Sequence, residues 1–240
     1  MINNDLRKRI LEKGAEVGCT HFPTAFSCLD VIKYLYDKII TPDDRFILSK
    51  GHGEMALFAV LESRGYHPNW TVHLNLNEKE GIYATTGSLG HGLPLGAGRA
   101  FAKKIKNEPG NIYVLTGDGE MEEGSNWEAL TIADNLKLDN LVLLIDWNKY
   151  QATDPIKTVS GNDYLKFTKK LRAFGCNVYL INGHDENEFL ELGNLEKGLN
   201  AVILDTIKGK GISYLEKNHA HKLDPIKEPN EYKRALEELK

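Results

Sequence analysis

The chain has 240 residues, of which 41% are hydrophobic and 27% are charged, and its formal net charge at pH 7 is −4. This length supports one sizeable core, and the composition is that of an ordinary globular protein rather than a disordered or fibrous one. Without a net positive charge or a basic stripe interleaved with aromatic residues, nucleic acid is not expected as a partner. Lys103, Lys104 and Lys106 are expected on a solvated helix face instead.

Cysteine usage and hydropathy indicate the compartment. Cys19, Cys28 and Cys176 form no C-x-x-C pair, which argues against both a disulfide framework and a zinc site. The N-terminal residues lack the apolar core of a secretion signal, and the longest apolar run, 141–145, is too short to span a bilayer. We therefore expect a cytoplasmic protein without a membrane partner.

The order of helix and strand patterns indicates the fold class. Apolar residues at helical spacing predict helices, and short apolar runs between turn signals predict strands. In chain order, the patterns predict helix 5–17 capped by Asn4, helix 29–36, strand 45–48, helix 54–64, strand 112–115, helix 126–136, strand 141–145, helix 164–173, strand 178–181, a helix near 186–192 and strand 201–206. This alternation predicts an α/β fold with a mostly parallel sheet, helices on both faces, and ligands beyond the carboxyl ends of the strands.

The domain organisation is expected to be simple. No repeat, low-complexity segment or linker divides the chain, so residues 1–240 are expected to form a single domain. The tail 218–240 is polar, carries Pro225 and Pro229, and becomes helix-prone from Glu231. We expect it to form a C-terminal arm on the surface or against a partner.

The most specific motif is Gly117-Asp118-Gly119, which comes directly after a predicted strand and before a helix. Its glycines let a ligand approach the backbone, and a nearby helix N-terminus favours an anion. Asn148 follows the next predicted strand. Because a right-handed crossover brings the carboxyl ends of neighbouring parallel strands side by side, Asp118 and Asn148 are predicted to meet. Their oxygens suit Mg²⁺ or another divalent cation, which commonly also binds phosphate oxygens, so a diphosphate-bearing cofactor is expected.

An ordinary turn at 117–119 is the alternative, and the matching Asn148 speaks against it. Together, Gly117-Asp118-Gly119 and Asn148 resemble the thiamine diphosphate motif, and the surrounding sequence resembles the N-terminal half of transketolase. Further segments agree in family order: 49–53 (SKGHG), 86–92 (TGSLGHG), 119–124 (GEMEEG), 137–141 (KLDNL) and 208–212 (KGKGI). The resemblance implies the thiamine diphosphate-binding fold, in the form of the domain that binds the diphosphate, called the PP-type domain.

The resemblance also implies roles for residues around the cofactor. Asp118, Asn148 and the main-chain carbonyl of Tyr150 would hold Mg²⁺. The diphosphate would contact His52 and the Gly117 to Gly119 turn, chiefly the Gly119 amide. Ser88, Leu89 and Gly90 match the family loop that lies along the aminopyrimidine. Ile207 matches an apolar position against the thiazolium. Glu123 matches an acidic residue that links paired active sites.

Histidines are the second signal, because imidazole suits proton transfer near neutral pH and can donate to a sugar hydroxyl. By resemblance, catalytic roles fall to His21, His52, His73 and His221, with His219 competing with His221 for the C-terminal position. The sequence departs from the family pattern at three places. Pro23 stands where the family usually has a glycine, and His91 stands where it has a glutamine. Near the position of Ala152 the family has a branched aliphatic residue. These departures imply an altered donor pocket.

The family resemblance implies a reaction and a partner. The glutamate that activates the aminopyrimidine lies in a part of transketolase beyond this chain, so a separate C-terminal subunit is expected, in an α2β2 assembly. The pair would transfer a two-carbon ketol unit from a ketose to an aldose, acting on sugars or sugar phosphates. One alternative is the α subunit of a 2-oxo acid dehydrogenase, against which segments 49–52 and 208–211 speak. A non-catalytic cofactor-binding or assembly subunit is the other, and the intact metal motif disfavours it.

Overall fold

The computed structural model describes residues 3–152 and 154–240 of the chain. Its centre is a five-stranded sheet in the order β1-β2-β3-β7-β6, and every neighbouring pair of these strands is parallel. The strands are β1 (Arg45–Leu48), β2 (Ile112–Gly117), β3 (Leu141–Trp147), β6 (Asn177–Asn182) and β7 (Asn200–Asp205). The predicted α/β fold with a parallel sheet is confirmed.

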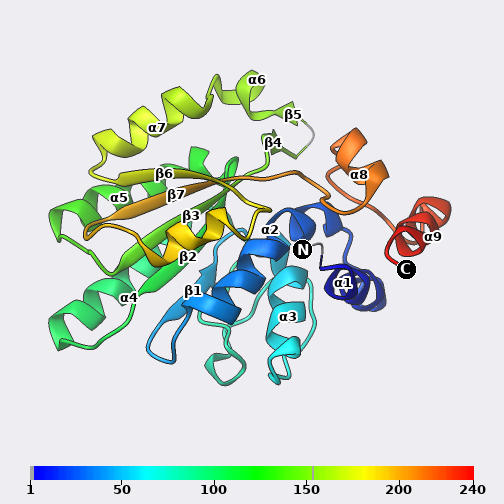
Figure 1. Ribbon diagram of the computed structural model, residues 1–240, viewed down its shortest axis with the longest axis horizontal. Coiled ribbons are helices and arrows are strands. Elements are labelled where there is room, and N and C mark those ends of the chain that lie inside the picture. Colours follow the sequence, from blue (N-terminus) through cyan, green and yellow to red (C-terminus); the bar gives the residue numbers. More distant parts are fainter. Residues whose placement is uncertain (1–2, 153) are drawn as a thin grey trace.

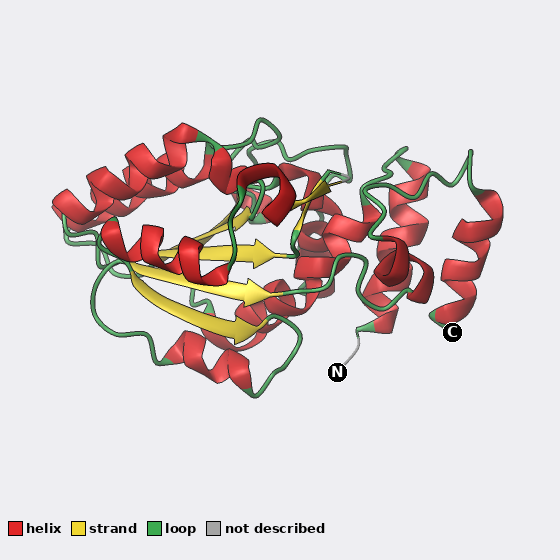
Figure 2. Cartoon of the chain, turned by 90° about the horizontal axis from the view of Figure 1, so that it is seen from above, coloured by secondary structure: helices red, strands yellow, loops and turns green. Residues whose placement is uncertain are grey.

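Helices cover both faces of this sheet (Figures 1 and 2). Successive residues of β3 point to opposite faces, so Val142 and Leu144 join one buried cluster while Leu143 and Ile145 join the other. Strands buried on both faces read as continuous apolar runs, and β2 and β3 are buried throughout. One cluster packs under α1 (Asn4–Glu16), α2 (Phe22–Tyr34) and α3 (Glu54–Ser63); the other packs under α4 (Gly92–Lys106), α5 (Gly124–Asn135) and α7 (Tyr164–Ala173).

The N-terminal helices differ from their predicted bounds. Asn4 is the first residue of α1 rather than its cap, and the side chain of the N-cap residue, Asn3, makes no capping hydrogen bond. The predicted helix 29–36 covers only the second half of α2, which begins at Phe22 with Pro23 in its first turn and continues into a π-helical turn, Leu35–Ile39. Because α2 is buried on all sides from Phe22 to Ile32, it has no apolar stripe that could mark its start.

Two further elements were misjudged from sequence. The pattern placed three lysines on a helix face but did not predict α4 as an element. Its buried face is made largely of small residues, and a Cβ added at Gly96 would lie 2.4 Å from Val114, so α4 packs too closely on β2 for large apolar side chains. The predicted helix near 186–192 is a 3₁₀ stretch, Glu188–Gly193.

Short elements border the carboxyl ends of the strands. They are the 3₁₀ turns Gly51–Gly53 and Glu120–Glu122, the antiparallel pair β4 (Tyr150–Gln151) and β5 (Asp154–Pro155), α6 (Ile156–Ser160) and α8 (Ser213–Asn218). A further 3₁₀ turn, Glu78–Glu80, lies before α4. The other short elements form a rim around the carboxyl ends of the strands.

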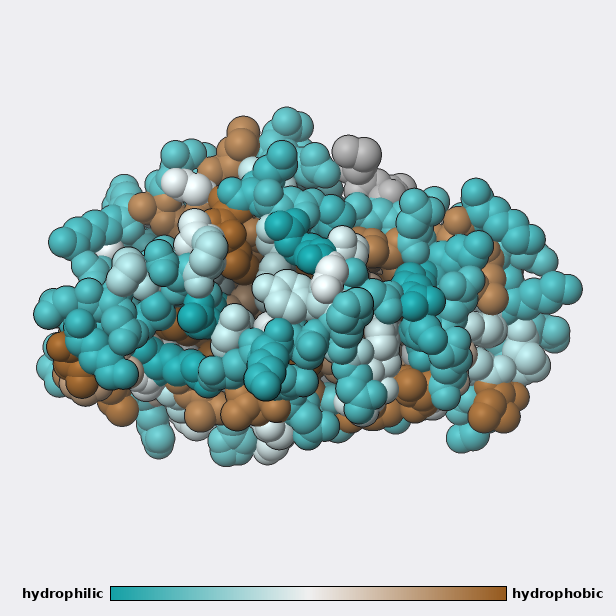
Figure 3. Space-filling view, turned by 90° about the horizontal axis from the view of Figure 1, so that it is seen from below, coloured by the Kyte–Doolittle hydropathy of each residue, from teal (hydrophilic) through white to brown (hydrophobic). Residues whose placement is uncertain are grey.

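The C-terminal segment 218–240 leads away from the sheet to α1 (Figure 1). Its helix α9 (Pro229–Glu238) lies beside α1, where the Tyr232 hydroxyl donates to the Leu11 carbonyl at 3.0 Å. Leu223 and Leu239 are buried in the core cluster under α1. The face in Figure 3 is mostly hydrophilic, with apolar side chains in separate patches. No helix among the described residues is both long and apolar enough to cross a bilayer.

Candidate active site

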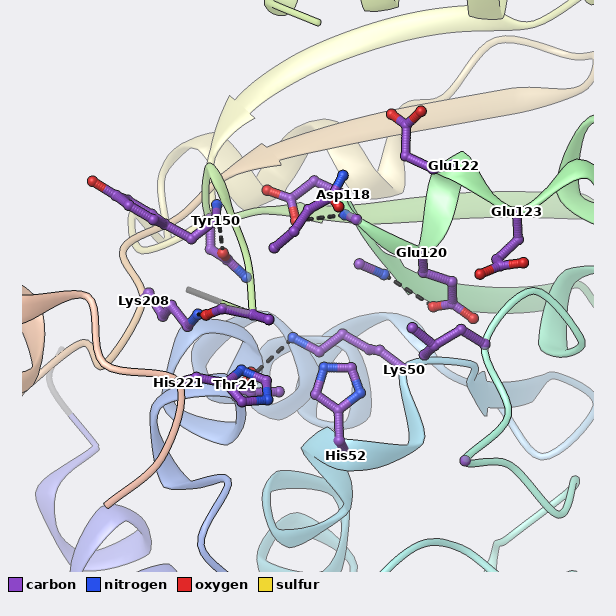
Figure 4. A pocket seen from close by; sticks show the side chains of 17 residues that line it. Thr24, Lys50, His52, Asp118, Glu120, Glu122, Glu123, Tyr150, Lys208 and His221 are labelled. Atoms are coloured by element: carbon purple, nitrogen blue, oxygen red, sulfur yellow. Dashed lines mark hydrogen bonds between the residues drawn. The ribbon is translucent and has the colours of Figure 1, made fainter. Parts of the chain in front are cut away.

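A cavity of about 430 Å³ lies at the carboxyl ends of the strands (Figure 4). Asp118 and Asn148, which directly follow β2 and β3, are in its lining, and so are Lys50 and Lys208 from the segments after β1 and β7. The parallel register sets Gly117 opposite Asp146, which brings the ends of β2 and β3 side by side. The volume lies in the range of small-molecule and cofactor pockets. The structure therefore brings Asp118 and Asn148 into one cavity, as their spacing predicted.

Asp118 is a buried carboxylate without a cationic hydrogen-bond partner among the described residues. Its Oδ1 accepts from the Gly119 N–H at 2.8 Å, and its Oδ2 accepts from the Lys149 N–H at 2.6 Å. Burial and the nearby Asp146 carboxylate raise the pKa of Asp118 to about 7. A bound cation would offset both effects.

Asn148 has a defined amide orientation. Its Nδ2 donates to Asp146 Oδ2 at 3.3 Å, and its Oδ1 accepts from the Tyr150 N–H at 3.1 Å. The amide oxygen therefore faces the loop that carries Tyr150, and Asn148, Tyr150 and Asp118 all line the cavity. Carboxylate, amide and main-chain oxygens form the donor set that a hard divalent cation prefers.

Lys50, which lines the cavity, forms a buried ion pair with Asp146. Asp146 also accepts from Ser27 Oγ at 2.5 Å and from the Thr206 hydroxyl, while Lys50 Nζ donates to the Thr24 carbonyl at 3.2 Å. Burial alone would raise the pKa of Asp146, but the charge and hydrogen bonds of its partners outweigh burial, so this pKa lies below its usual value. Asp146 is therefore a fixed anion beneath Asn148.

Glu120 accepts hydrogen bonds from three separate segments beside the cavity. Its Oε1 accepts from Ser49 Oγ at 2.5 Å and from the Gly90 N–H at 2.9 Å, and its Oε2 accepts from the Gly117 N–H at 3.1 Å. Gly90 has a φ of 82°, and a Cβ there would lie 2.6 Å from that of Glu123, so only glycine suits this approach. Glu123 itself lines the cavity.

Three histidines gather at one side of the site. The ring centroid of His21 lies 5.9 Å from that of His52 and 5.2 Å from that of His221, and the latter two rings line the cavity. Burial and then the neighbouring His221 lower the pKa of His21 to about 4. Burial likewise lowers the pKa of His52 well below its usual value, and that of His221. The Nδ1 atoms of His21 and His221 are buried and have no hydrogen-bond partner in the part of the chain that the structure describes.

Comparison with known proteins agrees with this geometry. Residues 31–230 match the family described as transketolase, thiamine diphosphate binding domain. The chain belongs to the transketolase family. It is 34% identical over 238 residues to the 6-deoxy-6-sulfo-D-fructose transketolase subunit of Clostridium sp. (strain MSTE9), a match that covers 89% of this chain and 86% of the relative. It is 35% identical over 246 residues to one subunit of the apulose-4-phosphate transketolase of Actinobacillus succinogenes, with 92% and 87% covered.

A solved transketolase shows the same fold. The crystal structure of the Campylobacter jejuni transketolase superimposes with a TM-score of 0.81 at 25% identity, covering 99% of this chain and 42% of that chain. This chain therefore corresponds to less than half of that transketolase. The thiamine diphosphate-binding fold that the sequence predicted is confirmed.

Not every residue that the transketolase resemblance singled out lines the cavity. Leu89 does, whereas Ser88 and Gly90 do not. His73 is exposed with a φ of 67°, and its ring packs beside Gly87 near the cavity lining. The Ile207 side chain is 37% exposed and borders an adjacent hollow. The two C-terminal histidines lie in different places. His221 lines the cavity, while His219 stacks on Tyr150 with ring centroids 4.1 Å apart.

The departures from the family pattern are placed as follows. Pro23 lies in the first turn of α2, Ala152 lines the cavity with a φ of 37°, and His91 is exposed directly before α4. Of these three residues, Ala152 is the one in the cavity lining.

Sequence reasoning missed the roles of Lys50, Glu120, Asp146 and Lys208, although each lies in or beside a quoted motif. Lys208 is 2% exposed, lines the cavity, and donates to the Ala152 carbonyl at 2.7 Å. Burial lowers its pKa to about 8. The available signal was a charged residue at the carboxyl end of a buried strand, as for Asp146, or within the short segment that follows one, as for Lys50, Glu120 and Lys208.

The residues present fit thiamine diphosphate with a divalent cation. An oxygen donor set around Asp118 suits the metal, and Lys50 and Lys208 place two ammonium groups in the lining, which suits an anion. Gly119 allows close approach of the backbone, and the buried Gln151 Nε2 beside it has no hydrogen-bond partner among the described residues.

Proposed function

We propose that this chain is the cofactor- and metal-binding subunit of a two-component transketolase. With a separate C-terminal subunit it would transfer a two-carbon ketol unit from a ketose to an aldose, using sugars or sugar phosphates. The observation that carries the proposal is the meeting of Asp118 and Asn148 at adjacent strand ends inside one cavity. Relatives that match this chain over most of both lengths are named as transketolase subunits, which supports a partner subunit.

The proposed cofactor contacts follow the cavity lining. Asp118, Asn148 and the Tyr150 carbonyl would hold Mg²⁺ or another divalent cation, and the Gly117 to Gly119 turn with His52 would bind the diphosphate. When bound, thiamine diphosphate supplies the electron sink for cleavage and formation of the carbon–carbon bond. The remaining proposed contacts are Ser88, Leu89 and Gly90 along the aminopyrimidine, Ile207 at the thiazolium, and Glu123 in a carboxylate network between sites.

The histidines are proposed to handle the substrate. His21, His52 and His221 are held as neutral imidazoles by burial, so each can accept or donate a hydrogen bond to a sugar hydroxyl. His73, exposed beside Gly87, would contact substrate from the mouth of the cavity. Neutral rings avoid placing further positive charge beside Lys50 and Lys208.

The assembly is proposed to be an α2β2 heterotetramer in the cytoplasm. Paired subunits agree with the subunit names of the relatives, and three buried free cysteines agree with a reducing compartment. The relatives named above are transketolases and transketolase subunits, which speaks against a 2-oxo acid dehydrogenase.

The test is co-expression with the candidate second subunit, followed by purification of the complex. Two assays are run with thiamine diphosphate and Mg²⁺: ketose-to-aldose transfer and decarboxylation of a 2-oxo acid. Ketol transfer that is lost in Asp118→Ala supports the proposal. Decarboxylation without transfer would assign the dehydrogenase class, and a stable complex with neither cofactor binding nor transfer would assign a non-catalytic role.

A further inference from the structure

The loop after β7 is held from outside the cavity by side chains of distant segments. The Ile207 N–H donates to His184 Nε2 at 2.9 Å, and the Lys210 carbonyl accepts from Arg7 Nε at 2.7 Å. His184 follows β6 and Arg7 belongs to α1, so the loop is fixed at two backbone points by two separate elements.

Asp30 of α2 joins these two side chains. Its Oδ2 accepts from Arg7 Nη2 at 2.8 Å and lies 2.9 Å from His184 Nδ1, while its Oδ1 accepts from Asn3 Nδ2 at 2.8 Å. Burial would raise the pKa of Asp30, but its hydrogen bonds to His184 and Arg7 hold this pKa at about 2. Asp30 is therefore a charged acceptor in a nearly enclosed cluster.

The hydrogen bonds assign the tautomer of His184. A backbone N–H can only donate, so the Nε2 atom that receives the Ile207 N–H carries no proton. In a neutral imidazole the proton then lies on Nδ1 and is donated to the Asp30 carboxylate. Asp30 thus orients the ring and selects the form that can accept from Ile207.

Lys208 lies between the two held points. Its side chain is buried in the cavity lining, and the next residue, Gly209, donates its N–H to the Pro23 carbonyl at 2.9 Å. Gly209 has a φ of 77°, and a Cβ there would lie 2.4 Å from that of Leu215. The loop therefore has little freedom while the contacts of Ile207 and Lys210 are in place.

We propose that His184 is a positioning residue of the cofactor site. As a neutral imidazole oriented by Asp30, it fixes the Ile207 backbone and thereby places the Lys208 ammonium group in the cavity, where it faces an anionic group of the bound cofactor. This inference rests on the proposed function for the identity of the ligand. The fixing of the loop at Ile207 and Lys210 rests only on the hydrogen bonds of the described residues.

Two conservative variants separate positioning from simple bracing. In His184→Asn the side-chain amide can keep a donor near the position of Nδ1 but has no atom at the position of Nε2, so the acceptor for the Ile207 N–H is lost. In His184→Gln the Oε1 atom reaches the position of Nε2 and can accept from Ile207, but the donor to Asp30 is lost. Each variant removes one hydrogen bond, so a bracing role predicts equal losses of thermal stability and equal losses of cofactor affinity.

The measurements are thiamine diphosphate affinity by calorimetry with Mg²⁺ on the assembled complex, thermal unfolding, and amide hydrogen exchange in peptides covering 205–211. His184→Asn is expected to weaken cofactor binding about tenfold, the size of effect seen when a residue that orients a ligand-binding group is removed. It is also expected to speed amide hydrogen exchange in the 205–211 peptides. His184→Gln is expected to stay within about threefold of the wild type at a similar unfolding temperature. Equal affinity losses in the two variants, or unchanged affinity in His184→Asn, would overturn the proposal.

A double-mutant cycle tests the route through Lys208. In a Lys208→Met background, His184→Asn is expected to cost no further cofactor affinity, because the group that it positions is gone. Full additivity of the two losses contradicts the proposal. If the wild-type complex bound no cofactor, the proposed function would fail instead, and the exchange rate around Ile207 would still report whether His184 holds the loop.

Discussion

The ammonium group of Lys50 and the carboxylate of Asp146 form an ion pair in which neither side chain is more than 1% exposed. The pair ties the end of β1 to the end of β3, directly beneath Asn148. Two charges withdrawn from water this completely depend on each other, because either one alone would remain buried and uncompensated.

Removing only Lys50 is therefore expected to destabilise the chain. Lys50→Met leaves the Asp146 charge unpaired and should cost about 3–5 kcal/mol of unfolding free energy, measured by denaturant titration. The double variant Lys50→Met/Asp146→Asn should regain part of this loss. Lys217→Met, at an exposed position, serves as the control. A Lys50→Met chain as stable as this control would contradict the buried pair.

The Asp118 carboxylate is expected to destabilise the metal-free protein and to contribute to ligand binding. Its pKa is raised to about 7, so its charge destabilises the metal-free fold as pH rises through that value and costs little below the usual pKa of an aspartate. Asp118→Asn should therefore unfold at a higher temperature than the wild type at about pH 8 with a chelator present.

The same variant should lose Mg²⁺-dependent cofactor binding by more than about 100-fold, beyond the cost of losing an outer-shell partner. Calorimetry on the complex measures this loss, and Asp139→Asn, at an exposed carboxylate, is the matched control. Unchanged affinity would remove Asp118 from the metal site.

The sequence predicted those features that depend on neighbouring residues in one strand-helix-strand unit. Continuous apolar runs identified β2 and β3, and the turn after each placed Asp118 and Asn148 at one edge. Both follow from short-range patterns together with the handedness of parallel crossovers. The sheet and the centre of the site were therefore predictable.

Other features depend on contacts that the order of residues does not display. Asp146 is satisfied by Ser27, Lys50 and Thr206, which come from three other segments of the chain, so its role emerges only in the folded protein. The all-round burial of α2 removed the periodicity that would have marked its start. His73 has a positive φ in a loop, and no local residue pattern indicated this conformation.

The histidine cluster predicts sensitivity to acid. The folded-state pKa of His21 is lowered to about 4, so its contribution to stability is present above its ordinary value of 6.5 and is lost as pH falls towards 4. His21→Gln does not titrate and should show a smaller fall in unfolding temperature across this interval. Thermal unfolding of both proteins from neutral to acidic pH measures the difference. Parallel curves would show that His21 is not held neutral by burial.

The stacking of Tyr150 on His219 predicts a separation between metal binding and substrate binding. Tyr150 would contribute only its carbonyl to the metal, while its ring stacks on His219, two residues before His221 in the cavity lining. Tyr150→Leu keeps the carbonyl but removes an aromatic pair, which is worth about 0.5–1.5 kcal/mol. The half-saturating Mg²⁺ concentration should stay within about twofold of the wild type, whereas the KM for the ketose should rise about two- to tenfold.

His219→Ala is the matched control for this separation, because it removes the same stack from the other side. It should reproduce the rise in KM without any effect on Mg²⁺, and the double variant should be no worse than either single variant. If Tyr150→Leu, but not His219→Ala, raised the Mg²⁺ requirement, the Tyr150 ring would hold the segment that carries Asn148 and Tyr150 rather than the segment that carries His221.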